Sequence, residues 1–223
     1  MKKEFEKRII SSLIVIPIAL FFIIKGSVFF TFFLGIFFLA TSYEWIKMNK
    51  KKSVKFLGLL YLLIAFYSAY LLRELYGFKI FLFIIIVCIF TDLGGYIFGK
   101  LFKGPKLTKI SPNKTYSGVL GGFILSVITG SIFSQKIYSA SEAFGSIFLY
   151  VDYNIHPHTT LLLLILIISS VSQIGDLIIS YFKRLAKVKD TGKILPGHGG
   201  LLDRIDGIIF VIPISYLLIN FFN

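Results

Sequence analysis

The chain has few of the residues that support disulfide, redox or zinc chemistry. Its single cysteine, Cys88, excludes an intramolecular disulfide and lies inside an apolar run, as a small buried hydrophobic residue does. His198 has no neighbouring Cys or His, so it gives no zinc signature. The other two histidines, His156 and His158, flank Pro157, and we interpret them as structural.

Acidic residues are also scarce, since 11 Asp and Glu stand against 24 Lys and Arg, for a net charge of +13. Such a balance can indicate nucleic-acid binding, but the bases cluster at the ends of hydrophobic runs and no nucleic-acid motif is present. A P-loop is excluded as well, because Gly192-Lys193 is followed by Ile194. The charge pattern is typical of a membrane protein whose basic residues set its topology and bind anionic headgroups or phosphate-bearing substrates. It predicts no nucleic-acid partner.

Apolar residues, in contrast, are abundant. They make up 56% of the chain, including 25 Phe, and the mean hydropathy is +0.84. We therefore expect an all-α fold, a polytopic helical integral membrane protein with about seven transmembrane helices (six to eight) in one membrane-embedded domain, residues 1–223. The expected spans are 9–24, 27–46, 56–72, 78–99, 117–134, 159–182 and 202–222. The first lacks an A-x-A cleavage site and is expected to remain uncleaved, and 140–153 could be interfacial or an eighth span.

The distribution of basic residues predicts the orientation. With the N-terminus in the cytoplasm, 20 of the 24 Lys and Arg fall in cytoplasmic segments, and only Lys25, Arg73, Lys79 and Lys136 fall outside. The positive-inside rule supports this orientation. It places residues 100–114 and 175–207 together on the cytoplasmic side of what we expect to be a bacterial inner membrane.

Residues 175–207 gather four aspartates, six glycines and many Lys and Arg between two hydrophobic runs. On a helix, Ser172, Asp176, Ser180 and Lys183 share one face. Asp203 and Asp206 would share a face of the next helix, so three carboxylates are expected to meet. Their repulsion favours a divalent cation, Mg²⁺ or Mn²⁺, bound by all three. The alternative is simple pairing of each acid with a neighbouring base, such as Asp203 with Arg184 or Asp206 with Arg204.

The loop between these two helices has the features of an anion-binding site. Glycines expose backbone N–H groups beside a helix N-terminus, and fixed positive charge surrounds them, which suits a polyphosphate. The alternative is an ordinary cytoplasmic loop, and for Lys187 and Lys193 the two interpretations are equally good. The residues that carry the prediction are Lys183, Arg184, Lys189, Gly197, His198, Gly199, Gly200 and Arg204.

A second polar segment lies at 91–122. Asp92 is interpreted as an interfacial or packing acid paired with a nearby Lys. The turn at 111–115 presents polar donors and a cation on the same side as the main segment, and we predict a binding role for it. Gly118, Gly121 and Gly122 form a small-residue face that predicts close helix packing.

These motifs resemble the signature of the phosphatidate cytidylyltransferase (CDP-diacylglycerol synthase) family. The residues that match are Ser180-x-x-Lys183-Arg184, Lys189-Asp190-x-Gly192, Pro196-Gly197-His198-Gly199-Gly200, Asp203-Arg204-x-Asp206, Asp92-x-Gly94-x-Tyr96 and Ser111-Pro112-x-Lys114-Thr115. The sequence departs from the family where Ile179 and Ser117 stand in place of glutamates. The carboxylates at 176, 203 and 206 are retained.

The resemblance implies a homodimeric membrane enzyme that uses CTP, phosphatidic acid and Mg²⁺ to make CDP-diacylglycerol and pyrophosphate. Catalytic roles are implied for Asp176, Lys183, Asp203 and Asp206. Substrate binding is implied for Ser111, Lys114, Thr115, Ser180, Arg184, Lys189, Asp190, His198, Gly199, Gly200 and Arg204. The competing hypotheses are a CTP-dependent polyprenol or phytol kinase, and a non-catalytic membrane protein that binds anionic lipid.

Overall fold

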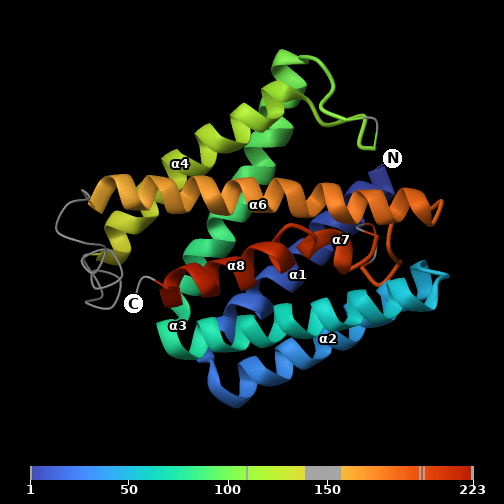
Figure 1. Ribbon diagram of the computed structural model, residues 1–223, viewed down its shortest axis with the longest axis horizontal. Helices are drawn as coiled ribbons and strands as arrows, with labels where there is room; N and C mark the ends of the chain where they lie inside the picture. Colours follow the sequence, from blue (N-terminus) through green and yellow to red (C-terminus); the bar gives the residue numbers. More distant parts are fainter. Residues whose placement is uncertain (1, 109, 139–156, 196, 198, 222–223) are drawn as a thin grey trace.

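The computed structural model is an all-α structure, and it describes residues 2–108, 110–138, 157–195, 197 and 199–221 (Figure 1). Within these ranges the only β-structure is two isolated bridges. The helices are α1 (Lys2–Lys25), α2 (Ser27–Met48), α3 (Lys52–Phe102), α4 (Tyr116–Tyr138), α6 (Pro157–Leu185), α7 (Leu202–Ile205) and α8 (Ile208–Phe221).

The expected polytopic membrane fold is confirmed. Four helices in the described part of the chain are long and apolar enough to cross a membrane, at 27–48, 52–102, 116–135 and 159–185, and shorter apolar helices occupy 15–25 and 208–221. The expected spans at 56–72 and 78–99 are both parts of α3, which has 51 residues and a kink at Gly77 (φ 81°, ψ 167°). A positive φ is inexpensive only for glycine, so the chain can turn there. The uncertain segment 140–153 lies outside the described residues.

Large apolar side chains cover the outside of the helices as well as the interior. Val28 is 77% exposed and Phe56 is 68% exposed, whereas Phe30 and Leu72 are fully buried. A water-soluble protein rarely exposes so much contiguous apolar surface, but a lipid bilayer solvates it well. The fold therefore has an apolar interior and a lipid-compatible exterior.

The second half of α3 packs against α4 through glycines, as the small-residue pattern predicted. A Cβ on Gly121 would overlap the side chain of Phe98, and a Cβ on Gly118 would lie 2.7 Å from the carbonyl oxygen of Gly95. The two helix backbones can approach this closely only because Cβ atoms are missing. Their shared end leads into the loop at 103–115 (Figure 1).

The single helix expected over 202–222 is wrong, because the chain forms the short α7 and then α8, with a turn at Asp206-Gly207. Gly207 packs directly on α6, where a Cβ would lie 2.5 Å from the Ser172 hydroxyl oxygen. Glycine also has low helix propensity. The break lets the backbone meet α6 at this point, and it leaves Asp203 on α7 and Asp206 in the turn that follows.

Candidate active site

The candidate active site is built where α6 meets the turn between α7 and α8. Gly175 and Gly207 lack Cβ atoms at this crossing, and a Cβ on Gly175 would lie 3.1 Å from the Asp206 carbonyl oxygen. This close approach brings the side chain of Asp176 near that of Asp206, so the two carboxyl groups interact directly. Two carboxyl groups can make this contact only when a proton or a cation offsets their repulsion.

Cationic and polar groups surround the carboxylate pair. The Lys114 ammonium forms an ion pair with Asp176 at 2.5 Å and also donates to the Gln173 carbonyl oxygen at 3.3 Å. The Ser180 hydroxyl donates to Asp176 Oδ1 at 3.3 Å. Asp92 lies close enough to interact electrostatically with both members of the pair. The 111–115 turn, which was expected on the same side as the main segment, therefore lies next to it, and Asp92 joins the same cluster.

The loop at 103–115 is held in place by its own backbone and by α6. Lys106 and Thr115 form an antiparallel bridge, and Arg184 Nε donates to the Ile110 carbonyl oxygen at 3.3 Å. Thr115 Oγ1 accepts the Gly118 N–H at 3.1 Å, as an N-cap of α4 does. Ser111 is half-buried in the same loop. Thr115 thus has a structural role in addition to the binding role that the sequence predicted for it.

Asp203 does not join the other two carboxylates. Its Oδ1 pairs with the Lys183 ammonium at 2.8 Å. Its Oδ2 accepts the backbone N–H groups of Thr191 at 2.8 Å and Gly200 at 3.0 Å, and the Thr191 hydroxyl at 3.1 Å. The partner expected under simple pairing was Arg184, and the observed partner is Lys183. Lys183 also interacts electrostatically with Asp176 and Asp206, so it links the two groups of acids.

The loop at 186–201 folds back on itself before α7. Leu195 and Gly199 form a bridge in which the Leu195 N–H donates to the Gly199 carbonyl oxygen at 3.0 Å. Gly199 has a φ of 86°, and a Cβ there would lie 3.2 Å from Asp203 Oδ2. Glycine is therefore required both by the backbone conformation and by the space beside Asp203.

The sequence reasoning missed Glu44. This carboxylate is only 1% exposed, although it sits on α2 within an apolar span. It accepts the backbone N–H groups of Leu201 and Leu202 at 3.0 and 2.8 Å and the Thr191 hydroxyl at 3.1 Å. A signal existed, because Glu44 is the only charged residue in the expected span 27–46, and an ionisable side chain in a span usually marks a functional site.

Other predicted binding residues lie at the rim. Lys189, Asp190, Arg184 and Arg204 are exposed, whereas Gly200 is buried. An open cavity of ≈ 890 Å³ is lined by α2 and the 188–199 segment, and its charged lining residues are Glu44, Lys47, Lys189, Asp190 and Lys193. His198 lies outside the described residues.

The two departures from the resembled signature occupy different surroundings. Ile179 is 3% exposed and packs in an apolar cluster with Trp45, Leu202 and Ile209. Ser117 is half-buried and its hydroxyl lies 3.0 Å from that of Thr115. Position 179 therefore faces the apolar interior in this chain, which explains why an aliphatic side chain is accommodated there.

The described residues contain no group of three or more His, Cys, Asp or Glu side chains arranged to hold a metal ion. The expected meeting of three carboxylates is replaced by the pair Asp176 and Asp206. A pair still fits Mg²⁺, which is commonly held by one or two carboxylates together with substrate phosphates and water. The all-oxygen donor set and the close carboxyl contact are consistent with such an ion.

The sequence was then compared with known proteins. The model of the cytidylyltransferase family matches residues 54–222. The phosphatidate cytidylyltransferase of Staphylococcus saprophyticus is 42% identical over 144 residues, covering 64% of this chain and 50% of the relative. That of Brucella melitensis is 38% identical over 163 residues, covering 72% of this chain and 54% of the relative. The aligned part of this chain thus spans about half the length of these relatives. Because the family match covers most of the sequence, the chain belongs to the cytidylyltransferase family.

Proposed function

We propose that the protein transfers the cytidylyl group of CTP to phosphatidic acid, giving CDP-diacylglycerol and pyrophosphate for phospholipid synthesis. The observation that carries the proposal is the convergence of three separate segments, the 103–115 loop, the end of α6 and residues 199–206, on one carboxylate pair with Lys114 and Lys183 beside it. The family membership and the names of the relatives support the same reaction.

In this reaction a phosphatidate oxygen attacks the α-phosphorus of CTP. The new P–O bond forms as the bond to the β-phosphate oxygen breaks, and pyrophosphate leaves. Lys183, held by Asp203, and the rim residues Arg184, Lys189 and Arg204 supply positive charge for the phosphates. Positioned charge of this kind stabilises the transition state of phosphoryl transfer.

We propose Asp176 and Asp206 as the ligands of a divalent cation, Mg²⁺ or Mn²⁺. When bound, the ion neutralises charge on the reacting phosphates. The close contact of the two carboxyl groups supports this assignment, since each needs a cation or a proton to offset the other. Asp203 is proposed to act through Lys183 and the 191–200 backbone, which already occupy its oxygens.

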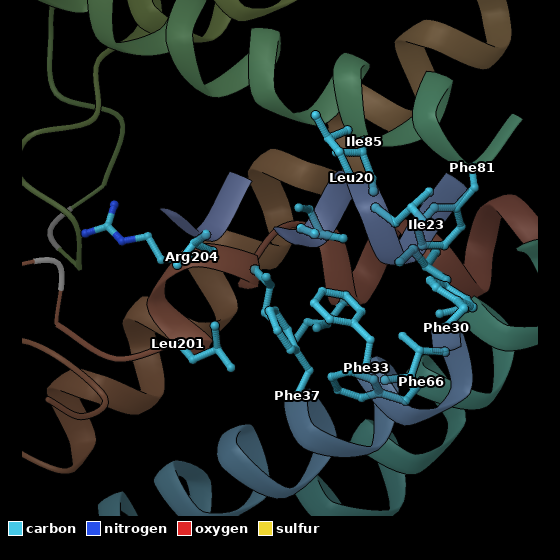
Figure 2. Close-up of a pocket in the computed structure, with 18 of the residues that line it drawn as sticks. Leu20, Ile23, Phe30, Phe33, Phe37, Phe66, Phe81, Ile85, Leu201 and Arg204 are labelled. Carbon is cyan, nitrogen blue, oxygen red and sulfur yellow. The ribbon is translucent and has the colours of Figure 1, made fainter. Parts of the chain in front are cut away.

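An apolar cavity of ≈ 450 Å³ supports a lipid acceptor (Figure 2). Its walls come from α1, α2, α3, α7 and α8, and among the described residues that line it Arg204 alone is charged. Figure 2 shows Arg204 at one end, with its guanidinium directed away from Phe33, Phe37 and the other apolar side chains. An acyl chain would be solvated by the cavity while the anionic phosphate lay near the guanidinium.

We further propose that the active site and the N-terminus face the cytoplasm of a bacterial inner membrane, and that the enzyme is a homodimer. The 20 to 4 distribution of basic residues supports the orientation. The dimer rests on the family resemblance.

Product analysis tests the proposed function. Purified protein would be incubated with radiolabelled CTP, phosphatidic acid and Mg²⁺, and the products separated. We expect equimolar CDP-diacylglycerol and pyrophosphate. CDP with a phosphorylated polyprenol or phytol, when that alcohol replaces phosphatidic acid, would instead identify a lipid kinase, and no turnover with either acceptor would favour a non-catalytic lipid-binding protein.

A further inference from the structure

Glu44 is a buried acid that contacts the loop before α7 from a different helix. Its Oε1 accepts the Leu201 N–H at 3.0 Å, and its Oε2 accepts the Leu202 N–H at 2.8 Å and the Thr191 hydroxyl at 3.1 Å. Burial of a carboxylate is costly unless hydrogen bonds satisfy it. Three donors aimed at one carboxylate provide that compensation, and hydrogen bonds to a charged acceptor are stronger than neutral ones.

The loop is shaped around this carboxylate. A Cβ on Gly192 would overlap Glu44, and a Cβ on Gly200 would lie 2.7 Å from Glu44 Oε2. Both glycines therefore leave room for the acid. The contact is a fitted one, made by residues 191–202 on one side and by α2 on the other.

Thr191 connects Glu44 to the residues of the proposed reaction. Its hydroxyl lies 3.1 Å from Glu44 Oε2 and 3.1 Å from Asp203 Oδ2. Asp203 in turn pairs with Lys183 at 2.8 Å, and Lys183 interacts with the Asp176 and Asp206 carboxylates. Hydrogen bonds and an ion pair therefore connect α2 to Lys183, which interacts electrostatically with the carboxylate pair.

We propose that Glu44 is a positioning residue for the reaction: it holds residues 191–202 so that Asp203 and Lys183 are correctly placed. The inference rests on the proposed function for its reaction, and on the contacts above for its structure. Glu44 precedes the segment matched by the family model, residues 54–222. The N-terminal part of the chain thus contributes directly to the order of the site.

The test uses Glu44→Gln in the full-length protein, with Glu74→Gln as the matched control. Glu74 is an exposed glutamate on α3 that accepts the Ser27 N–H at 3.2 Å, so it reports the effect of the same chemical change elsewhere. Glu44→Gln removes the negative charge. It also replaces one acceptor oxygen with an NH₂ group, which cannot accept a hydrogen bond from the donors of the loop. Hydrogen exchange of residues 191–203 measures loop order, and kcat per folded molecule measures positioning.

We expect Glu44→Gln to speed exchange in 191–203 and to lower kcat by about tenfold or more, with the KM for phosphatidic acid within about twofold of wild type. Glu74→Gln should change neither quantity. Thr191→Val removes the hydroxyl and should also lower kcat. Thr191→Ser keeps the hydroxyl and should retain most of the wild-type activity.

The proposal would be overturned if Glu44→Gln kept the wild-type kcat, or if its activity fell only in proportion to the folded fraction. An exchange change without a kcat change would also reject the positioning role. If the wild-type protein itself made no CDP-diacylglycerol, the proposed function would fail first, and positioning for that reaction would fail with it. The wild-type assay therefore separates the two failures.

Discussion

At the residue scale, Lys114 is the most direct cationic partner of the carboxylate pair. Its ammonium pairs with Asp176 at 2.5 Å, and both side chains are about a quarter exposed, at 26% and 27%. Water therefore screens the ion pair only in part. Its importance should lie in the charge that it places next to the substrate phosphates.

We predict that Lys114→Met lowers kcat for cytidylyl transfer by about tenfold or more while the folded fraction stays near that of wild type. Lys106→Met is the control, because Lys106 lies in the same loop and its side chain is exposed. Steady-state kinetics with CTP and phosphatidic acid would measure both. Equal rates for the two variants would reject a role for Lys114 in the reaction.

Ile179 offers a second residue-scale prediction. It is 3% exposed and packs against apolar neighbours, so Ile179→Glu would bury an unpaired charge and should destabilise the fold by about 3 kcal/mol or more. Ile179→Val should cost only about 1 kcal/mol. Cys88 is a buried free thiol, so a thiol-reactive dye that reports its exposure on heating can measure the change. A melting temperature of Ile179→Glu equal to that of Ile179→Val would contradict the buried position.

At the element scale, the sequence predicted the helices better than the helix ends. Long apolar runs and the glycine face of 118–122 are local signals, and they located the spans and the face on which α4 packs closely. The break at Asp206-Gly207 depends on how closely Gly207 approaches Ser172 on another helix. Such a tertiary contact has no local pattern, so the sequence did not predict the break in the helix.

The same difference between local signals and tertiary contacts explains which features of the site could be predicted from the sequence. The sequence indicated the segment 175–207 and the turn at 111–115, which the structure brings together, because charge and glycine are rare next to apolar spans. It could not show that Asp203 would face Lys183 while Asp176 and Asp206 meet, since both outcomes depend on helix crossing. Glu44 was detectable as an acid in a span, but its partners lie 147 to 158 residues away in the sequence.

The α3–α4 crossing gives the element-scale prediction. A Cβ at Gly121 would overlap Phe98, so Gly121→Ala should separate the helices and destabilise the fold by about 1–3 kcal/mol. Gly35→Ala is the matched control, because no atom lies within 4 Å of a Cβ there and alanine should stabilise α2 by up to about 1 kcal/mol. Thermal unfolding in detergent would measure the difference. Equal stability changes for the two variants would contradict the close packing.

At the scale of the whole molecule, the proposed orientation can be tested by cysteine accessibility. In a Cys88→Ser background, Lys189→Cys should react with a membrane-impermeant maleimide in inside-out vesicles only. Lys25→Cys should react only in vesicles of the opposite orientation. Both lysines are exposed, so lack of reaction reflects the membrane side. Labelling of both positions from one side would contradict the orientation that the basic residues indicate.

The proposed function requires cytidylyl transfer at the carboxylate pair. The most direct measurement is the Mg²⁺-dependent release of pyrophosphate from CTP in the presence of phosphatidic acid, comparing the wild-type protein with Asp206→Asn at equal folded concentration. We predict robust release by the wild type and a loss of about 100-fold or more in the variant. A folded Asp206→Asn protein that released pyrophosphate within about twofold of the wild-type rate would contradict the account.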